Sequence, residues 1–454
     1  MYATTNPATG ELVQEFPTLS DDEAEAALAR SAEAYRAWSA RTIAERADLL
    51  RAIADLHRKQ AEELSAVVTL EMGKPIAQAR GEAELAASIY EYYADKGPAL
   101  LEDEELDVAG TGRAVVRTAP IGPLLGIMPW NFPLYQVARF VAPNLLLGNT
   151  ILLKHAESCP QTSLAIARTI HDSGVPDGVY QSIFATHDQT ARMIADPRLQ
   201  GVSITGSERA GRAVGALAGQ HLKKCVLELG GSDPLIILPG SDLDAAVPAA
   251  VNGRFWNAGQ VCTSMKRTIV SDGLWDEFMG KFLGEVESWQ AGDPRQEDTR
   301  LGPMSSLRAR ADVAEVVEDA IAKGATLHAG GSVPDGPGAW YPATVLSGVT
   351  PDMRAYHEEI FGPVAVVHRV GSEDEAVELA NSSPYGLGGA VFAADEQAAE
   401  MVADRLEVGM VGLNMLVRSS PELPFGGVKN SGIGRELGRF GLDEFANKKL
   451  VRFA

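Results

Sequence analysis

The chain has 454 residues, too many for one ordinary hydrophobic core, so we expect two or three domains. Hydrophobic residues make up 45% and charged residues 22%, which is typical of a globular protein in water, and no apolar run reaches the length of a membrane span. Lys and Arg number 40 against 61 Asp and Glu, and the resulting net charge of −21 disfavours nucleic acid and anionic membranes as partners.

The first hundred residues are predicted to be helical. Ser20-Asp21-Asp22-Glu23 forms a capping box, and apolar residues at helical spacing follow over 27–38. Helical periodicity continues over 41–72, and a third helix is expected over 82–95, before Gly97-Pro98.

Strands and helices alternate from about residue 114 onward. Strands are predicted at 114–117, 124–128, 150–154, 201–205, 226–228 and 234–238, with helices at 161–173, 209–219 and 243–251. This alternation predicts an α/β fold with a doubly wound parallel sheet, and a second α/β block extends over about 259–425. The β-prone segment 450–453 has no neighbour in sequence, so we expect it to pair with 114–117 or with another subunit.

One of the chain's three cysteines combines with a glutamate in a way that suits nucleophilic catalysis. Cys262 ends the run Asn257-Ala258-Gly259-Gln260-Val261-Cys262, and Glu228 precedes Leu229-Gly230-Gly231. A thiol on a glycine-containing segment can approach a substrate closely, and a carboxylate from a second segment could activate water beside it. Taken alone, Cys159, Cys225 and Cys262 are each better explained as small buried hydrophobes.

The cysteine and histidine pattern also limits the cell compartment and the metal chemistry. Three cysteines are too few for a disulfide framework, so a reducing cytoplasm is the expected compartment. No Cys-x-x-Cys or His-x-x-x-His pair is present, and we expect no metal site.

The run Pro129-Trp130-Asn131-Phe132-Pro133 follows a predicted buried strand. Its prolines fix the backbone, so the amide of Asn131 could be held rigidly as a hydrogen-bond donor. As an oxyanion donor such an amide contributes about 3–4 kcal/mol to lowering the barrier. The alternative is that Asn131 only caps the next helix.

Gly206 and Ser207 lie at a predicted junction between a strand and a helix. Free backbone N–H groups and the positive end of the helix suit a pyrophosphate there, although a plain strand–turn–helix fits equally well. Lys154 and Glu157, at the end of the preceding strand, could bind ribose hydroxyls or be solvated loop charges.

Together these motifs resemble the NAD(P)-dependent aldehyde dehydrogenase superfamily, over essentially the whole chain. The matching segments are 71–75, 129–133, 154–157, 206–207, 228–231, 259–262, 358–363, 381–387 and 424–432. The resemblance implies a Rossmann-type cofactor domain over 1–104 and 121–229 and a catalytic domain over 230–430. It also implies a small β oligomerisation element over 105–120 and 431–454, and therefore a homodimer or homotetramer.

The resemblance assigns a role to each site residue. Cys262 would add to the aldehyde carbon to give a thiohemiacetal, whose oxyanion the Asn131 side chain and the Cys262 N–H would hold. Hydride loss to the nicotinamide would leave a thioester, and Glu228 would activate the water that hydrolyses it. The cofactor contacts would come from Trp130, Lys154, Glu157, Gly206, Ser207, Glu359 and Phe361.

The segment Lys154-His155-Ala156-Glu157 departs from the family's usual Lys-Pro-Ser/Ala-Glu by losing the proline. Both contact residues are retained, and a carboxylate at Glu157 should accept a hydrogen bond from a 2′-hydroxyl and repel a 2′-phosphate. We therefore expect NAD rather than NADP, although a rotated glutamate would permit both.

Two arginines among apolar neighbours suggest a substrate that carries a carboxylate, because a guanidinium binds carboxylates in bidentate fashion. Arg139 matches an arginine of succinate-semialdehyde dehydrogenases, which also share a serine pair here represented by Ser419-Ser420. Other members place a second arginine where this chain has Trp256, so Arg254 or Arg418 is expected to compensate. Arg139, Arg418 and Ser419 are accordingly the predicted substrate contacts.

The predicted activity is oxidation of succinate semialdehyde, or a similar ω-oxo-acid, to the carboxylate. A broad aliphatic or aromatic aldehyde dehydrogenase, with Arg139 only structural, is the alternative within the same fold. Glu228 disfavours a CoA-acylating enzyme, and the joint presence of Cys262, Glu228 and Asn131 disfavours a non-catalytic protein.

Overall fold

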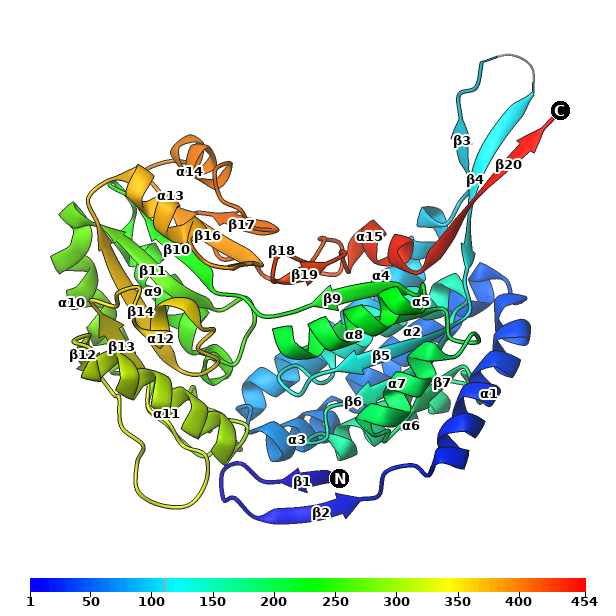
Figure 1. Ribbon diagram of the computed structural model, residues 1–454, viewed down its shortest axis with the longest axis horizontal. Coiled ribbons are helices and arrows are strands. Elements are labelled where there is room, and N and C mark those ends of the chain that lie inside the picture. The colour runs from blue at the N-terminus through cyan, green and yellow to red at the C-terminus, as the bar shows by residue number, and fades with distance from the viewer. Residues whose placement is uncertain (110–111) are drawn as a thin grey trace.

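The computed structural model describes residues 1–109 and 112–454, and its helices surround two large sheets in two lobes (Figure 1). The sheet of the first lobe runs in the order β19-β9-β8-β5-β6-β7, and β5 to β9 pair in parallel. This confirms the predicted doubly wound α/β arrangement. Its strands are β5 (Pro123–Met128), β6 (Thr150–His155), β7 (Tyr180–Ser182), β8 (Gly201–Thr205), β9 (Lys224–Glu228) and β19 (Gly432–Ile433).

The helices of the first lobe bury most of this sheet. All residues of β6 are buried, as expected for a central parallel strand covered on both faces. Every residue of helix α5 is buried as well, so its few polar side chains must find partners inside the protein. The helices are α1 (Asp21–Ser39), α2 (Ile43–Lys59), α3 (Ala61–Met72), α4 (Ile76–Leu100), α5 (Tyr135–Leu147), α6 (Pro160–Asp172), α7 (His187–Ala195) and α8 (Glu208–Gln220).

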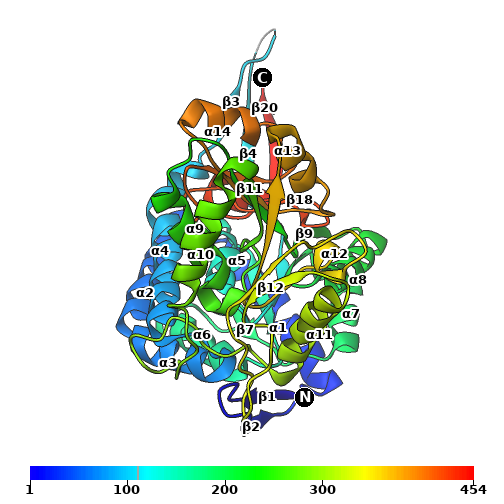
Figure 2. The same ribbon diagram turned by 90° about the vertical axis from the view of Figure 1, so that its left-hand side faces the viewer.

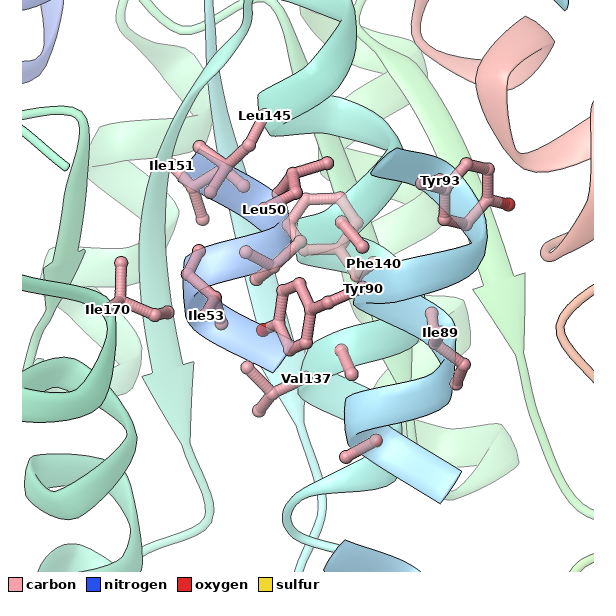
Figure 3. Close-up of a cluster of buried hydrophobic side chains, with 14 of the residues drawn as sticks. Leu50, Ile53, Ile89, Tyr90, Tyr93, Val137, Phe140, Leu145, Ile151 and Ile170 are labelled. Carbon is pink, nitrogen blue, oxygen red and sulfur yellow. The ribbon is translucent and has the colours of Figure 1, made fainter. Parts of the chain in front are cut away.

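The largest hydrophobic cluster joins the helices of this lobe to its sheet (Figure 3). Leu50 of α2, Tyr90 of α4 and Phe140 of α5 meet there with Ile151 of β6. This packing fixes α5 against the sheet, and α5 in turn carries predicted site residues.

The second lobe has a mixed sheet in the order β12-β13-β14-β11-β10-β16-β17. Its strands are β10 (Asp233–Ile237), β11 (Met265–Ser271), β12 (Thr326–Ala329), β13 (Thr344–Ser347), β14 (Val364–Val370), β16 (Gly388–Phe392) and β17 (Met410–Leu413). Its helices are α9 (Leu243–Phe255), α10 (Trp275–Val286), α11 (Leu307–Ala322), α12 (Arg354–His357), α13 (Glu373–Asn381) and α14 (Glu396–Ala403). Short elements complete it: η1 (Trp256–Gly259), η2 (Asp272–Leu274), β15 (Tyr385–Gly386) and β18 (Val428–Lys429).

A third sheet projects away from both lobes (Figures 1 and 2). It consists of β3 (Glu104–Leu106), β4 (Arg113–Pro120) and β20 (Ala446–Phe453), and helix α15 (Gly438–Glu444) leads into β20. β20 pairs with β4 in antiparallel register, Leu450 opposite Val116, which confirms the predicted pairing of the C-terminal segment within one chain. The oligomerisation role of this element stays a prediction, and its residues 110 and 111 lie outside the described part of the chain.

The N-terminal region differs from the predicted run of helices. It opens with an antiparallel hairpin of β1 (Tyr2–Thr5) and β2 (Leu12–Phe16). The sequence of β2 has no apolar alternation, and its Leu12 and Val13 are exposed. The predicted third helix is longer than expected and runs through Pro98. Gly97 is a packing residue there, not a helix end: a Cβ at this position would lie 2.0 Å from a methyl carbon of Leu146.

In the described part of the chain, no helix is both long and apolar enough to cross a membrane. The predicted capping box at Ser20 and Glu23 is confirmed, with both reciprocal hydrogen bonds present.

Candidate active site

A cavity of about 360 Å³ opens where the start of α5, the end of α9 and two loops of the second lobe converge. Cys262 lines it, and apolar side chains make up most of its wall. The lining residues are Leu85, Phe132, Tyr135, Gln136, Asn252, Gly253, Trp256, Val261, Cys262, Thr263, Met265, Leu416, Val417, Arg418, Ser419 and Phe425. A concave, mostly apolar site with a few polar groups is typical of small-molecule binding.

The backbone leading to Cys262 is strained. Asn257, Ala258 and Gly259 all have left-handed φ values, of 52°, 52° and 68°. Only glycine adopts this region freely, so Ala258 costs on the order of 1 kcal/mol. Hydrogen bonds hold the turn: the Asn257 amide donates to the Asn131 carbonyl at 3.0 Å, and Gln78 accepts from the Asn257 N–H at 2.9 Å.

Asn131 lies against this turn, and its oxyanion role stays a prediction. One N–H of its amide donates to the carbonyl of Gln260 at 3.0 Å, and its oxygen accepts from the Gln136 amide at 3.1 Å. Both bonds fix the plane of the amide, which is buried. The remaining N–H of the same NH₂ group is then available to a ligand.

Cys262 is partly buried, and its surroundings disfavour the thiolate. Burial raises the pKa of Cys262 to about 11, while the positive charges of Lys266 and Arg139 oppose that rise. Lys266 also binds the nucleophile segment directly, because its ammonium donates to the Val261 and Cys262 carbonyls at 2.8 Å each.

Glu228, at the end of β9, is buried in surroundings that favour its neutral form. Neither carboxylate oxygen has a hydrogen-bond partner among the described residues. Burial raises the pKa of Glu228 well above its usual value, and Arg139 partly offsets the rise. Glu228 is not among the residues that line the cavity, and its carboxylate lies against Gly426, where a Cβ would stand 2.8 Å from Oε1. A proton acceptor with such a pKa is poised to titrate above the ordinary carboxyl range.

Arg139 does not lie where its predicted role requires. Its guanidinium is fully buried, forms an ion pair with Glu436 and donates to Thr205 at 3.0 Å. Two cavity-lining rings, those of Tyr135 and Phe425, lie between it and the cavity, 5.2 and 4.4 Å from the guanidinium carbon. Capture of a substrate carboxylate by Arg139 does not fit this placement, because Glu436 already occupies the guanidinium.

Arg418 and Ser419 do line the cavity, as predicted. The Arg418 side chain is exposed and has no ion pair or hydrogen bond to another described residue. Ser419 accepts a hydrogen bond from the Tyr135 hydroxyl at 2.9 Å, and Arg139 donates to that hydroxyl at 3.4 Å. Arg139 therefore contacts the cavity wall through Tyr135 and Phe425, and reaches Ser419 only by way of the Tyr135 hydroxyl.

Arg254, the other expected compensating arginine, also points elsewhere. It is fully buried and donates to the carbonyls of Val364 at 2.6 Å, Ile360 at 2.8 Å and Gly259 at 3.2 Å. These bonds tie the nucleophile segment to the loop before β14. Trp256, by contrast, lines the cavity at the position of the family's second arginine, 5.6 Å from the ring of Phe132.

The predicted cofactor residues of the first lobe lie on neighbouring strand ends. Lys154 is buried at the end of β6 with its ammonium 5.3 Å from the centre of the Tyr2 ring, and burial lowers the pKa of Lys154. Glu157 is exposed three residues later. Ser207 caps helix α8 by accepting from the Ala210 N–H at 3.3 Å, and the Gly206 N–H donates to the Glu228 carbonyl at 2.9 Å.

The predicted residues of the second cofactor segment meet the first lobe. Phe361 contacts Trp130 edge to face at 5.7 Å, and Glu359 accepts from the Gly231 N–H at 3.0 Å. A buried cation, an exposed carboxylate and a helix N-terminus thus border one edge of the sheet, with an aromatic pair beside them. This set fits a dinucleotide, which needs donors for its phosphates and acceptors for its ribose hydroxyls.

Two charged residues near Cys262 were missed in the sequence. Lys266 lies on β11, shortly after Cys262 in sequence, and Asp233 is the first residue of β10. Both side chains are buried. A separate buried ion pair joins Lys74 to Glu82, which accepts from the N–H groups of Leu134 and Tyr135 at 2.8 and 3.1 Å. The sequence gives no periodic signal for these contacts.

Comparison with known proteins agrees with this arrangement. The sequence model of the aldehyde dehydrogenase family matches residues 1–451. A succinate-semialdehyde dehydrogenase [NADP(+)] of Deinococcus radiodurans is 54% identical over 99% of this chain and 94% of its own. Succinate-semialdehyde dehydrogenase [NADP(+)] 1 of Mycobacterium tuberculosis is 46% identical over 100% of this chain and 99% of its own.

Among solved structures, the succinic semialdehyde dehydrogenase of Streptococcus pyogenes in complex with NADP+ superposes with a TM-score of 0.97. It is 39% identical, over 99% of both chains. All three proteins are described with NADP(+), which does not support the predicted preference for NAD. The protein described here belongs to the aldehyde dehydrogenase family.

Proposed function

We propose that this enzyme oxidises succinate semialdehyde to succinate with NADP+. The observation that carries the proposal is the guanidinium of Arg418, which has no partner among the described residues and lines the same cavity as Cys262. On a chain with a net charge of −21, a free arginine in a substrate cavity is well explained by an anionic ligand. The relatives' names point to the same substrate.

In the proposed reaction, the Arg418 guanidinium and the Ser419 hydroxyl hold the substrate carboxylate, so that the aldehyde group faces Cys262. The thiolate adds to the aldehyde carbon, and the free N–H of the Asn131 amide stabilises the oxyanion of the thiohemiacetal. Because burial raises the pKa of Cys262, most molecules carry a thiol at neutral pH, and the proton must leave before or during the attack.

Glu228 is proposed as the base for the second half of the reaction. Once the thioester has formed, the carboxylate removes a proton from the attacking water and succinate leaves. The raised pKa of Glu228 suits this task, because a stronger base accepts the proton more readily near neutral pH. This role also argues against a CoA-acylating enzyme.

Lys154, Glu157, Gly206, Ser207, Trp130, Glu359 and Phe361 are proposed to bind the cofactor. When bound, the nicotinamide accepts the hydride that leaves the aldehyde carbon. We propose NADP+ because exposed Glu157 forms no ion pair with another described residue and is free to turn away, while Lys154 offers a positive charge to a 2′-phosphate. The relatives described with NADP(+) support this choice.

The domain division also remains a proposal: cofactor domain over 1–104 and 121–229, catalytic domain over 230–430, and oligomerisation element over 105–120 and 431–454. We propose a homodimer or homotetramer that uses the projecting sheet, where Leu450 and Phe453 are 58% and 37% exposed. Free cysteines at all three positions are compatible with a reducing cytoplasm.

The test is to follow reduction of NADP+ and NAD+ with succinate semialdehyde and to identify the product by mass spectrometry. We expect succinate, a higher kcat/KM with NADP+, and no activity in Cys262→Ser. The proposal fails if succinate is not formed or if the serine variant keeps its activity. Equal efficiency with butanal would instead favour a broad aldehyde dehydrogenase.

A further inference from the structure

A carboxyl group that has no part in the proposed reaction lies beneath the nucleophile segment. Asp233, the first residue of β10, is 1% exposed, and neither of its oxygens forms a hydrogen bond of good geometry with a described residue, the Gly388 N–H being the donor beside it. The position of a Cβ at Gly231 would be 2.6 Å from the Cys262 carbonyl oxygen and 2.9 Å from Oδ1 of Asp233. The glycine thus lets the carboxyl group approach the backbone of Cys262.

The ammonium of Lys266 lies close to both Asp233 and Cys262 and binds the nucleophile segment. It donates to the carbonyls of Val261 and Cys262 at 2.8 Å each and forms an ion pair with Glu359 at 3.2 Å. Two of the three N–H donors of the lysine thus go to backbone carbonyls, and none forms a hydrogen bond with Asp233. The ammonium therefore fixes two carbonyl groups at the nucleophile and leaves Asp233 only its electrostatic field.

The charged groups that face Asp233 are Lys266 of β11 and Glu359 of the loop before β14. Burial raises the pKa of Asp233 to about 7; Lys266 and the Gly388 N–H favour the charged form, and Glu359 disfavours it. Near neutral pH the carboxyl group is thus divided between its two forms.

Cys262 feels the same set of charges. Beyond the effect of burial, Lys266 and Arg139 lower the pKa of the thiol, and Glu359 and Asp233 raise it. Ionisation of Asp233 therefore opposes ionisation of the thiol, and the two titrations are coupled.

We propose that Asp233 is a positioning residue for Cys262, whose carboxylate balances the Lys266 ammonium that fixes the Val261 and Cys262 carbonyls and so tunes the reactivity of the thiol. The inference rests on the proposed role of Cys262 as nucleophile. It adds a residue that acts on the thiol through Lys266 without touching the substrate.

The rate of Cys262 alkylation by iodoacetamide between pH 6 and 9, followed by mass spectrometry of its peptide, measures this effect without catalysis. Asp233→Asn keeps the shape and removes the charge, so alkylation at pH 8 should be about three- to tenfold faster than in the wild type. The wild-type profile should also rise less steeply with pH, because Asp233 ionises over the same range. If Asp233→Asn does not fold, Asp233→Ser replaces it in the same alkylation experiment.

Lys266→Met tests whether the effect of Asp233 on the thiol depends on the ammonium. This variant should alkylate more slowly than the wild type, and without the ammonium the buried Asp233 stays neutral. Adding Asp233→Asn to it should then change the rate less than twofold. Glu71→Gln, which alters a buried carboxyl group of the first lobe, is the matched control and should leave the profile within twofold of the wild type.

The inference is overturned if Asp233→Asn overlays the wild-type profile, or if its effect is equally large in the Lys266→Met background. These outcomes differ from failure of the proposed function, which Cys262→Ser tests through turnover. An active serine variant would remove the nucleophile role whatever the alkylation rates are.

Discussion

Replacing Arg418 with leucine should separate acidic from neutral aldehydes. The guanidinium lines the cavity and has no partner among the described residues, so its removal orphans no group of the protein. A hydrogen bond between charged groups contributes about 1.5–3 kcal/mol, which corresponds to about a 10- to 100-fold loss of kcat/KM for succinate semialdehyde. Because the carboxylate is remote from the reacting carbon, the loss should appear mainly in KM.

Initial rates of NADPH formation with succinate semialdehyde and with butanal measure this effect. Butanal lacks the carboxylate, so its kcat/KM should change less than threefold in Arg418→Leu. Arg308→Leu, at an exposed arginine on α11 outside the cavity, is the matched control and should behave as the wild type with both substrates. Equal losses for both aldehydes, or no loss for the acid, would refute the role of Arg418.

Other changes test the charges around the cavity. Glu228→Gln should retain a burst of NADPH but lower the steady-state rate at least 100-fold. The rise of kcat with pH should also vanish, because the carboxylate form of Glu228 is the active base. A normal steady-state rate would exclude Glu228 as that base. Arg139→Leu leaves buried Glu436 unpaired, so the free energy of unfolding should fall by about 3–5 kcal/mol. The kcat should fall for acidic and neutral aldehydes alike. A loss confined to the acidic aldehyde would restore Arg139 as a carboxylate ligand. The pKa of Asp233 is raised in the folded protein, so its contribution to stability is complete below about pH 4 and declines up to about pH 7. In denaturant unfolding, the free energy of unfolding of Asp233→Asn should therefore rise relative to that of the wild type by up to about 4 kcal/mol across this range. A difference that stays constant with pH would contradict this.

Patterns local in sequence predicted the parts of the fold that depend on local interactions. The capping box at Ser20 and the buried run of β6 were found because caps and apolar runs act over a few residues. The β1–β2 hairpin was missed because its stability comes from contacts such as the bond from the Thr4 hydroxyl to Glu71, distant in sequence. Gly97 was taken for a helix end because its packing against Leu146 cannot be read from either residue alone.

The site shows the same limit. Motifs indicated Asn131, Cys262 and Arg418, and the structure brings all three to one region. The buried placement of Arg139 does not fit its predicted substrate role. Its position on a helix could not show that the guanidinium pairs with Glu436, which comes from a segment distant in sequence.

Lys266 and Asp233 show what pattern reasoning leaves out. Each looks like an ordinary strand residue in the sequence, and only the parallel pairing of β10 with β11 places both beneath Cys262. Burial then gives the carboxyl group and the ammonium an influence on the thiol that neither would have at the surface.

A single comparison, that of kcat/KM for succinate semialdehyde and for butanal with NADP+ in the wild-type enzyme, decides whether the cavity selects a carboxylate. Cys262 and Arg418 in one cavity predict that the acid is preferred at least tenfold, with succinate as the product. Equal values for the two aldehydes, or no aldehyde-dependent reduction of NADP+, would contradict it.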